Sequence, residues 1–205
     1  SYKLAMRSFD IFNEQIGRLE FAKKKCHGNV LDITFGDFLS YHSSKLLLNE
    51  GAKEVWSYDI SESNADVYKR FFNKNKEIVI KSQGNPSKAL QDGYFDCVIS
   101  SETIQYSKNY HKEIELYYKT LKQNGKLIIS TSNKDAPKKI KSIQNEIGNV
   151  NEFAKDKFIS LLSSKFQKID LFSQRIIEED EIKKSVSLEK IRAKEKLRYF
   201  FANRL

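Results

Sequence analysis

The chain is poor in cysteine, proline and glycine, and each shortage excludes a class of protein. Its 205 residues include two cysteines, two prolines and eight glycines. Cys26 and Cys97 are far apart and lack the spacing of a metal site, so we expect reduced thiols and no bound metal. So few prolines and glycines argue against long disordered tracts. The chain also lacks an apolar run of about 18 residues, which excludes a transmembrane helix.

The first residues, "SYKLAMRSFDIF", lack the apolar stretch of a signal peptide. Together with the expected reduced cysteines, this favours a cytoplasmic protein. A length of 205 residues fits one domain. A chain of this size buries roughly 70% of its unfolded surface, so it needs no disulfide or metal to hold its core together.

Charge of one sign is in moderate excess. The net charge is +9, from 36 lysines and arginines against 27 aspartates and glutamates. A nucleic-acid surface is one interpretation of this excess. However, no run reaches five consecutive basic residues, and acidic residues are interspersed throughout. We therefore favour lysines scattered over solvated faces and do not expect a nucleic-acid partner.

Short apolar segments alternate with helical patterns from residue 29 to residue 132. Such strands are typical of a parallel sheet covered by helices on both faces. A helix over 8–25 precedes them, with Phe9, Phe12, Ile16 and Leu19 on one side. The expected strands are 29–33, 53–61, 77–82, 95–101 and 126–132. The expected helices between them are 39–51, 62–75 and 110–125, the last ending at Gly125.

The C-terminal third has a different pattern. Two helical patterns, 134–148 and 150–166, are followed by an alternating strand at 167–174. A charged helix or flap over 178–196 comes next. The aromatic residues near the C-terminus predict a final strand that pairs with 167–173.

Ligands of parallel sheets bind at the carboxyl ends of the strands, so the residues there are candidates for function. Asp32 closes the first strand, and Gly36 lies in the following turn. Asp59 closes the second strand, where a carboxylate can accept hydrogen bonds from both ribose hydroxyls of a nucleoside. A helix-capping role is the alternative for Asp59. A dinucleotide site needs three glycines in this turn, and only Gly36 is present, so we disfavour NAD.

Four segments together resemble the class I S-adenosylmethionine-dependent methyltransferases of the small-molecule type. They are "VLDITFGDFLS", "GAKEVWSYDIS", "GYFDCVISSETIQY" and "LKQNGKLIISTSN". The late segments "FISLLSSKFQKIDLF" and "RYFFANR" are similar to that family's last helix and strands. The resemblance covers residues 17–203 in the family's order. It implies an α/β, Rossmann-like class I methyltransferase fold: a mostly parallel seven-stranded sheet with helices on both faces and an antiparallel C-terminal strand.

The resemblance also implies the cofactor and its contacts. The cofactor would be S-adenosylmethionine, with S-adenosylhomocysteine as product. Asp32 and Gly36 would lie under its methionine part, and Asp59 and Ile60 would hold the ribose and one adenine face. Other implied positions are Gly84 and Asn85 near the adenine amino group, and Ser100, Ser101 and Glu102 beside the transferred methyl group. No metal site is implied.

Two positions of the first motif depart from the family. Thr34 and Phe38 stand where glycines usually stand, although Gly36, where the backbone meets the ligand, is present. Glycine permits a positive φ and close backbone approach, which threonine does not do as readily. We expect cofactor binding to survive at Thr34 and Gly36. The alternative is a non-catalytic methyltransferase-like subunit with an altered loop.

A base is needed if the methyl acceptor is a hydroxyl group. The candidates are His42, Tyr106 and His111; Tyr106 replaces a frequent histidine of the family. The resemblance implies a small-molecule or sugar/glycan-precursor acceptor. An RNA methyltransferase is a further alternative, but the base-methylating motif with consecutive prolines is absent after the fourth strand.

The predicted organisation is a single methyltransferase domain over 1–205. It comprises an N-terminal helical cap (1–28), a cofactor-binding core (29–132) and a C-terminal part (133–205) in which 174–195 could form a lid. The protein would be a monomer or homodimer without a membrane span.

Overall fold

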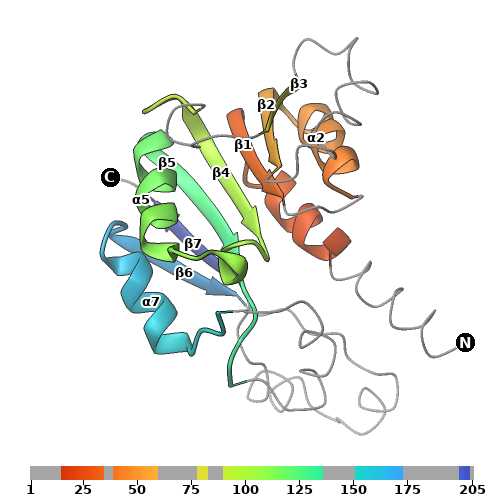
Figure 1. Cartoon of the computed structure of the whole chain (residues 1–205). Coiled ribbons are helices and arrows are strands. Elements are labelled where there is room, and N and C mark those ends of the chain that lie inside the picture. The colour runs from red at the N-terminus through yellow and green to blue at the C-terminus, as the bar shows by residue number, and fades with distance from the viewer. Residues whose placement is uncertain are drawn as a thin grey trace, which may run out of the picture.

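The computed structural model describes residues 15–34, 39–59, 78–82, 90–135, 151–172 and 199–203. Within these residues seven strands form one sheet in the order β3-β2-β1-β4-β5-β7-β6 (Figure 1). The strands are β1 (Gly28–Thr34), β2 (Ala52–Asp59), β3 (Ile78–Ser82), β4 (Phe95–Ser101), β5 (Leu121–Ser130), β6 (Lys168–Phe172) and β7 (Tyr199–Asn203). Strands β1 to β5 run parallel, and β7 is antiparallel to both β5 and β6. The predicted α/β class is confirmed.

The helical elements lie on both faces of this sheet (Figure 1). They are residues 15–23, α2 (Leu39–Asn49), the short 3-10 helix η1 (Ile104–Tyr106), α5 (Tyr110–Thr120) and α7 (Lys155–Ser163). Successive residues of a strand point to opposite faces, and two cores result. Leu31, Val98 and Leu127 pack in the core that includes residues of α5 and α7. Their neighbours Val30 and Cys97 pack in the other core, with Ala22 of the first helical segment.

Helix α5 ends five residues earlier than expected, at Thr120 instead of Gly125. The Thr120 hydroxyl donates to the carbonyl of Tyr117 at 3.0 Å, and the backbone N–H of Tyr94 donates to the Thr120 carbonyl at 3.0 Å. Leu121, which has no exposed surface, pairs with Phe95 as the first residue of β5. The prediction that the helix continues to Gly125 was wrong. Burial of Leu121 in the sheet stabilises a strand from this residue on, and this outweighs the local preference for a helix that ends at the glycine.

Strand β7 confirms one expectation and adds a neighbour. It pairs with β6 as predicted, through Asp170 and Phe201 among others. It also pairs with β5, where Ile128 lies opposite Phe201. The last strand in the sequence therefore lies between β5 and β6, which the local pattern does not reveal.

The two cysteines correct a prediction. Cys26 and Cys97 are joined by a disulfide, with their Cα atoms 5.6 Å apart and each residue 1% exposed. The expectation of two free thiols was wrong because the fold brings these residues together across a sequence separation of 71. The bond ties the turn after the first helical segment to the central strand β4.

Several predicted segments lie outside the described residues. They are the helix over 62–75, residues 136–148 of the helix predicted over 134–148, the possible lid over 174–195, and residues 1–14 of the N-terminal cap. The division into cap, core and C-terminal part therefore stays a prediction. Among the described helices, none is both long and apolar enough to cross a membrane.

At Gly28, the first residue of β1, the addition of a single methyl group should strongly destabilise the folded protein. Its φ is +73°, and an added Cβ would overlap the Asp96 carboxylate, which accepts hydrogen bonds from Asn29 N and Lys122 Nζ at 2.8 Å each. We expect Gly28→Ala to lower the free energy of unfolding by about 3 kcal/mol, from backbone strain plus displacement of Asp96. Gly93→Ala is the matched control, because its φ is +61° and nothing lies within 4 Å.

Urea denaturation would measure both variants. The control should lose only about 1 kcal/mol, the cost of the left-handed backbone. Equal losses in the two variants would contradict a steric role for Asp96.

Candidate active site

The carboxyl ends of β1, β2 and β4 meet at one edge of the sheet. Thr34 pairs with Asp59 at the ends of β1 and β2, and Ile33 pairs with Ser100 near the end of β4. The chain proceeds from β1 outward through β2 and β3, then returns to β4 on the other side of β1. This reversal is the topological switch point, where open α/β sheets bind their ligands.

Asp32 lies within β1, two residues before the last residue of the strand, Thr34. It is 2% exposed, and its Oδ2 accepts a hydrogen bond of 2.5 Å from the Ser43 hydroxyl of α2. Burial raises the pKa of the Asp32 carboxyl to about 6, and the Ser43 hydrogen bond opposes part of that rise. The strand continues to Thr34, one residue beyond the expected end at residue 33. Asp32 therefore links β1 to α2.

The structure places the backbone of the predicted ribose carboxylate. Asp59 is the last residue of β2, directly beside Thr34 of β1. The side chains of Thr34, Asp59 and His42 are not described, although His42 lies in the first turns of α2. Four other predicted positions lie outside the described residues: Gly36, Ile60, Gly84 and Asn85. Their roles stay predictions.

Ser100 belongs to a buried hydroxyl network between β4 and α5. Its Oγ is 2.6 Å from the Thr103 Oγ1 and 3.5 Å from the Tyr117 hydroxyl. The Tyr117 hydroxyl in turn donates to Glu113 Oε2 at 3.1 Å. Burial, and then the nearby Glu113 carboxylate, hold the pKa of Tyr117 well above its usual value. The Ser100 hydroxyl is thus engaged inside the protein, while its neighbour Ser101 is half-buried at the strand end.

Burial also raises the pKa of Glu113, although hydrogen bonds from Ser107 and Tyr117 lower it in part. Sequence analysis did not single out Glu113 or Tyr117. Their i, i+4 spacing on α5 places both on one face of the helix, and this is the signal that could have found them. Their hydrogen bonds fix the position of the turn that follows β4.

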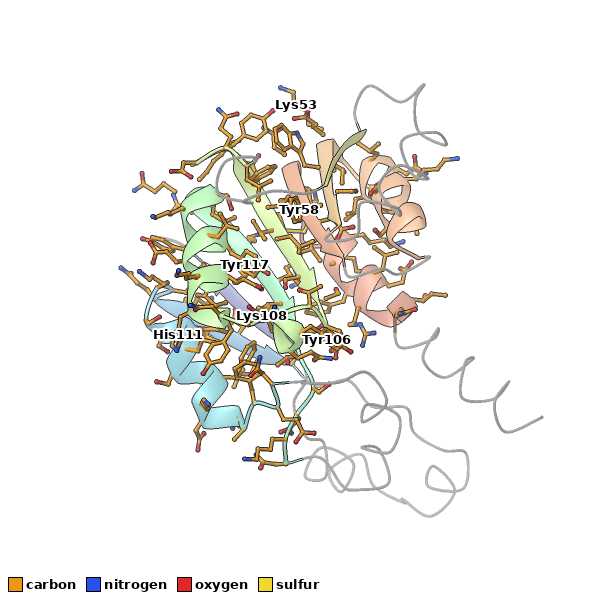
Figure 2. The ribbon with its side chains drawn as sticks, in the orientation of Figure 1. Lys53, Tyr58, Tyr106, Lys108, His111 and Tyr117 are labelled. Atoms are coloured by element: carbon orange, nitrogen blue, oxygen red, sulfur yellow. A yellow bond between two sulfur atoms is a disulfide. The ribbon has the colours of Figure 1, made fainter. Side chains whose placement is uncertain are left out.

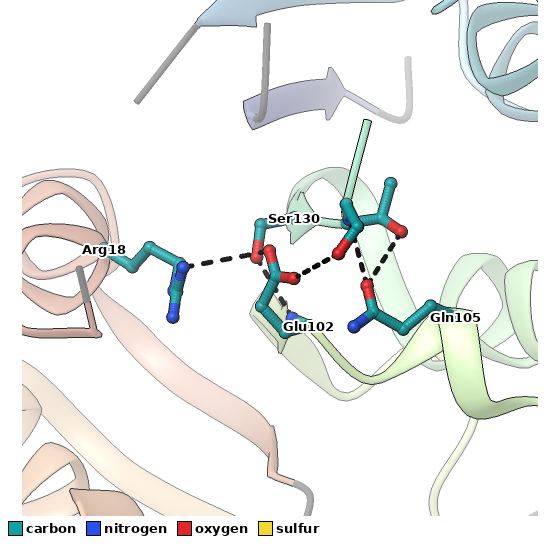
Figure 3. Close-up of polar contacts among 6 residues, drawn as sticks. Arg18, Glu102, Gln105 and Ser130 are labelled. Carbon is teal, nitrogen blue, oxygen red and sulfur yellow. Dashed lines mark hydrogen bonds and ion pairs between the residues drawn. The ribbon is translucent and has the colours of Figure 1, made fainter. Parts of the chain in front are cut away.

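Glu102, immediately after β4, lies among polar groups from three elements (Figure 3). Its backbone has a φ of +55°, and its N–H donates to the carbonyl oxygen and to the hydroxyl of Ser130, each at 3.1 Å. Its Oε2 accepts from the Ser132 hydroxyl at 3.2 Å, and its Oε1 is 3.8 Å from Arg18 Nη1. These contacts hold the Glu102 carboxylate at the carboxyl edge, next to the switch point.

Arg18 was missed by sequence analysis. The apolar pattern predicted Ile16 and Leu19 on the inward side of the helix. Leu19 does pack against the second core, but Ile16 is 37% exposed, and the Arg18 side chain is only 8% exposed. Arg18, Ala22 and Cys26 are buried at steps of four instead. The inward side of this helix therefore includes Arg18, which forms an ion pair with Glu102, in addition to the predicted Leu19.

Gln105 joins the segments that enclose this edge. Its side-chain Oε1 accepts from the Thr131 hydroxyl at 3.2 Å and from Ser132 N at 3.0 Å. Its backbone carbonyl accepts from Asn151 N at 2.6 Å, and the Asn151 side chain donates to the Ser107 carbonyl at 2.7 Å. The turns after β4 and β5 and the segment before α7 therefore form one hydrogen-bonded wall.

The described candidates for a general base differ in position (Figure 2). Tyr106 is half-buried at the end of η1, close to the end of β4. His111 is exposed in the first turn of α5, and its ring centroid is 4.7 Å from that of Tyr110. Tyr110 itself packs against Phe153 and beneath Lys157 of α7. Tyr106 thus lies near the carboxyl edge of the sheet, whereas His111 lies next to Tyr110, on the side of α5 that faces α7.

The donor set of this edge matches a cofactor that carries a nucleoside and a positively charged sulfonium. Asp59 ends β2 at the switch point, where a carboxylate would accept hydrogen bonds from ribose hydroxyls, and Asp32 is a second acidic residue within β1. Hydroxyl and carboxylate oxygens are suited to such a ligand. Among the described residues, no group of three or more His, Cys, Asp or Glu side chains could hold a metal ion.

Comparisons with known proteins agree with this architecture. Residues 17–129 match the family described as "Methyltransferase domain". No curated protein shows significant sequence similarity to the chain.

Three similar solved structures illustrate the fold. A Haloferax volcanii complex of the Trm112 methyltransferase activator with a putative methyltransferase has a TM-score of 0.69 at 13% identity, covering 97% of this chain and 94% of that one. A SAM-dependent methyltransferase from Archaeoglobus fulgidus has a TM-score of 0.67 at 18% identity, with coverages of 95% and 94%. A geranyl diphosphate methyltransferase in complex with SAM has a TM-score of 0.66 at 13% identity, with coverages of 92% and 85%.

The family match spans more than half of the chain and includes both strands that carry the candidate carboxylates. The sheet order, the switch point and the acidic residue at the end of β2 fit the cofactor of that family. This chain belongs to the methyltransferase-domain family and is an S-adenosylmethionine-dependent methyltransferase.

Proposed function

We propose that this methyltransferase acts on a small molecule, such as a sugar or glycan precursor. The supporting observation is the Glu102 carboxylate at the carboxyl end of β4, held by Ser132 and Arg18. A carboxylate at this point opposes the phosphodiester backbone of a nucleic acid by like-charge repulsion. The residues after β4, "SSETIQY", also lack the proline-containing motif of base-methylating enzymes.

When bound, S-adenosylmethionine supplies an electrophilic methyl group on a sulfonium. A nucleophilic atom of the acceptor forms a bond to that methyl carbon as the carbon–sulfur bond breaks, and the bonding electrons stay on sulfur. The donor is already activated, so the protein mainly orients the acceptor and excludes water. We assign Asp59 to ribose binding, Asp32 to support of the loop after β1, and Tyr106 to the acceptor side. His42 and His111 remain alternatives for a proton acceptor.

Calorimetric titration with S-adenosylmethionine and S-adenosylhomocysteine tests this assignment. We expect micromolar binding that Asp59→Ala weakens by about tenfold to hundredfold, because two hydrogen bonds to a charged group are lost. Asp156→Ala, which removes an exposed aspartate of α7, is the matched control and should bind as the wild type does. Equal affinities for the two aspartate variants would contradict the ribose role of Asp59.

Thr34 and Phe38 stand at positions where the family usually has glycines, so they bear on how tightly this methyltransferase binds its cofactor. The same titration of the wild type measures that affinity. Absence of binding to either ligand by a well-folded wild-type sample would contradict the proposed assignment.

A further inference from the structure

Strand β5 contains a bulge near its start. Residues 122–125 lie opposite a single residue of β4, Asp96, where the pairing register shifts. The extra residues of a bulge are left out of the ladder of backbone hydrogen bonds. The base of this bulge is anchored, because Lys122 Nζ donates to Asp96 Oδ2 at 2.8 Å and Leu121 has no exposed surface. Asn124 of the bulge is exposed, so solvent reaches its side chain.

The backbone of the bulge restricts which residues can occupy positions 124 and 125. At Gly125, an added Cβ would lie 2.9 Å from the carbonyl oxygen of Lys122 and 2.9 Å from Cδ2 of Leu121. A backbone oxygen cannot move aside as the end of a long side chain can, so this position requires glycine. Asn124 has a φ of +62°, a conformation that asparagine tolerates better than most residues with a Cβ. The bulge therefore contains an Asn–Gly pair, which occurs once in the sequence.

Among the described residues, none forms a hydrogen bond with the Asn124 side chain. Other described asparagines are held in place. The Oδ1 atom of Asn109 accepts from Lys112 N at 3.1 Å, and the side chain of Asn151 donates to the Ser107 carbonyl at 2.7 Å. The Asn124 amide is therefore free to rotate toward its own backbone.

We propose that Asn124 is a site of spontaneous deamidation in the folded protein. The backbone nitrogen of Gly125 attacks the side-chain carbonyl carbon of Asn124 and forms a bond to it. The bond from that carbon to the side-chain nitrogen breaks, and ammonia leaves with the proton of the Gly125 N–H. Water then opens the succinimide ring at either carbonyl, which gives aspartate or isoaspartate. Asparagine is a thermolabile residue, and glycine presents no side chain to hinder the attack.

The bulge lies at the opposite edge of the sheet from the candidate active site. It is near the first residue of β5, whereas Asp59 is the last residue of β2, and the two strands belong to the same parallel set. Deamidation replaces a neutral amide by a carboxylate and lowers the net charge of +9 by one. Neither the reaction nor its product involves the cofactor, so this modification and the proposed function can fail separately.

Incubation of the folded, full-length protein in mildly alkaline buffer tests the proposal. Peptide mapping by mass spectrometry would follow each asparagine over time, and electron-transfer fragmentation would distinguish aspartate from isoaspartate. We expect Asn124 to convert at least about tenfold faster than Asn49, with both products present. Ion-exchange chromatography should show a more acidic species that grows at the same rate. Circular dichroism would verify that the protein stays folded during the incubation.

Asn49 is the internal control. It is exposed as Asn124 is, but the next residue is Glu50, whose N–H donates to the Leu46 carbonyl at 3.1 Å. Asn124→Gly is the matched variant, because glycine adopts the positive φ without strain. It should remove the acidic species that the wild type accumulates. Conversion of Asn124 no faster than that of Asn49, or the same acidic species in Asn124→Gly, would each overturn the proposal.

Discussion

Loss of the Cys26–Cys97 disulfide is expected to lower the free energy of unfolding by about 4 kcal/mol. The bond closes a loop with a sequence separation of 71, and a cross-link of that span restricts the unfolded chain by roughly this amount. It is a large share of the 5–15 kcal/mol by which a typical domain is stable. Reduced protein should therefore unfold at a clearly lower urea concentration.

Urea denaturation with and without a phosphine reductant would measure this effect. Both residues are 1% exposed, so the reductant must be added to the unfolded protein before refolding. The double variant Cys26→Ala/Cys97→Ala is the control, and its transition should not respond to the reductant. Titration of free thiols in denaturant gives a second measure. Two reactive thiols in protein purified without reductant would show that the bond does not form.

Asp32→Asn is expected to stabilise the protein at neutral pH while weakening cofactor binding. The folded state raises the pKa of this carboxyl from 3.8 to about 6 because burial penalises the charge. A raised pKa means that the folded protein binds the proton more tightly than the unfolded chain does. The contribution of Asp32 is thus most favourable below about pH 4 and is lost as the pH rises through about 6.

The difference between those pKa values corresponds to about 3 kcal/mol, which is the upper limit of the gain at about pH 7.5. Asparagine keeps the shape and can still accept the hydrogen bond from Ser43. Denaturation of both proteins from about pH 4 to about pH 8 should show the variant's advantage growing with pH and vanishing at the acid end. The same samples should bind S-adenosylhomocysteine more weakly if the charge supports the loop after β1.

Ser43→Ala provides the opposite perturbation. It removes the hydrogen bond of 2.5 Å that favours the charged form of Asp32, so stability at neutral pH should fall by about 1–3 kcal/mol.

For the Asp32→Asn variant, the contradicting outcome is a lower free energy of unfolding than the wild type at neutral pH. That result would show that burial of the Asp32 charge does not destabilise the folded protein.

Local sequence pattern was sufficient for the parallel strands of the sheet and for the position of their carboxyl edge. Short apolar strands that alternate with helices indicate parallel strands buried on both faces, and this holds for β1 to β5. Asp59 could be placed near the carboxyl edge because it lies toward the end of an apolar strand pattern, and it is the last residue of β2. These features depend on neighbours in the chain, which a single sequence displays.

Tertiary contacts decided the features that join distant residues. Cys26 meets Cys97, Arg18 meets Glu102, and β7 lies between β5 and β6. The inward side of the first helical segment was predicted in part: Leu19 packs against the core, but Ile16 is exposed and Arg18 is buried against Glu102. The end of α5 was mispredicted because Leu121 gains more from burial in the sheet than from another helical turn. The local sequence pattern shows which secondary structure each segment favours by itself. Which residues become buried or paired depends on contacts between segments that are far apart in the sequence.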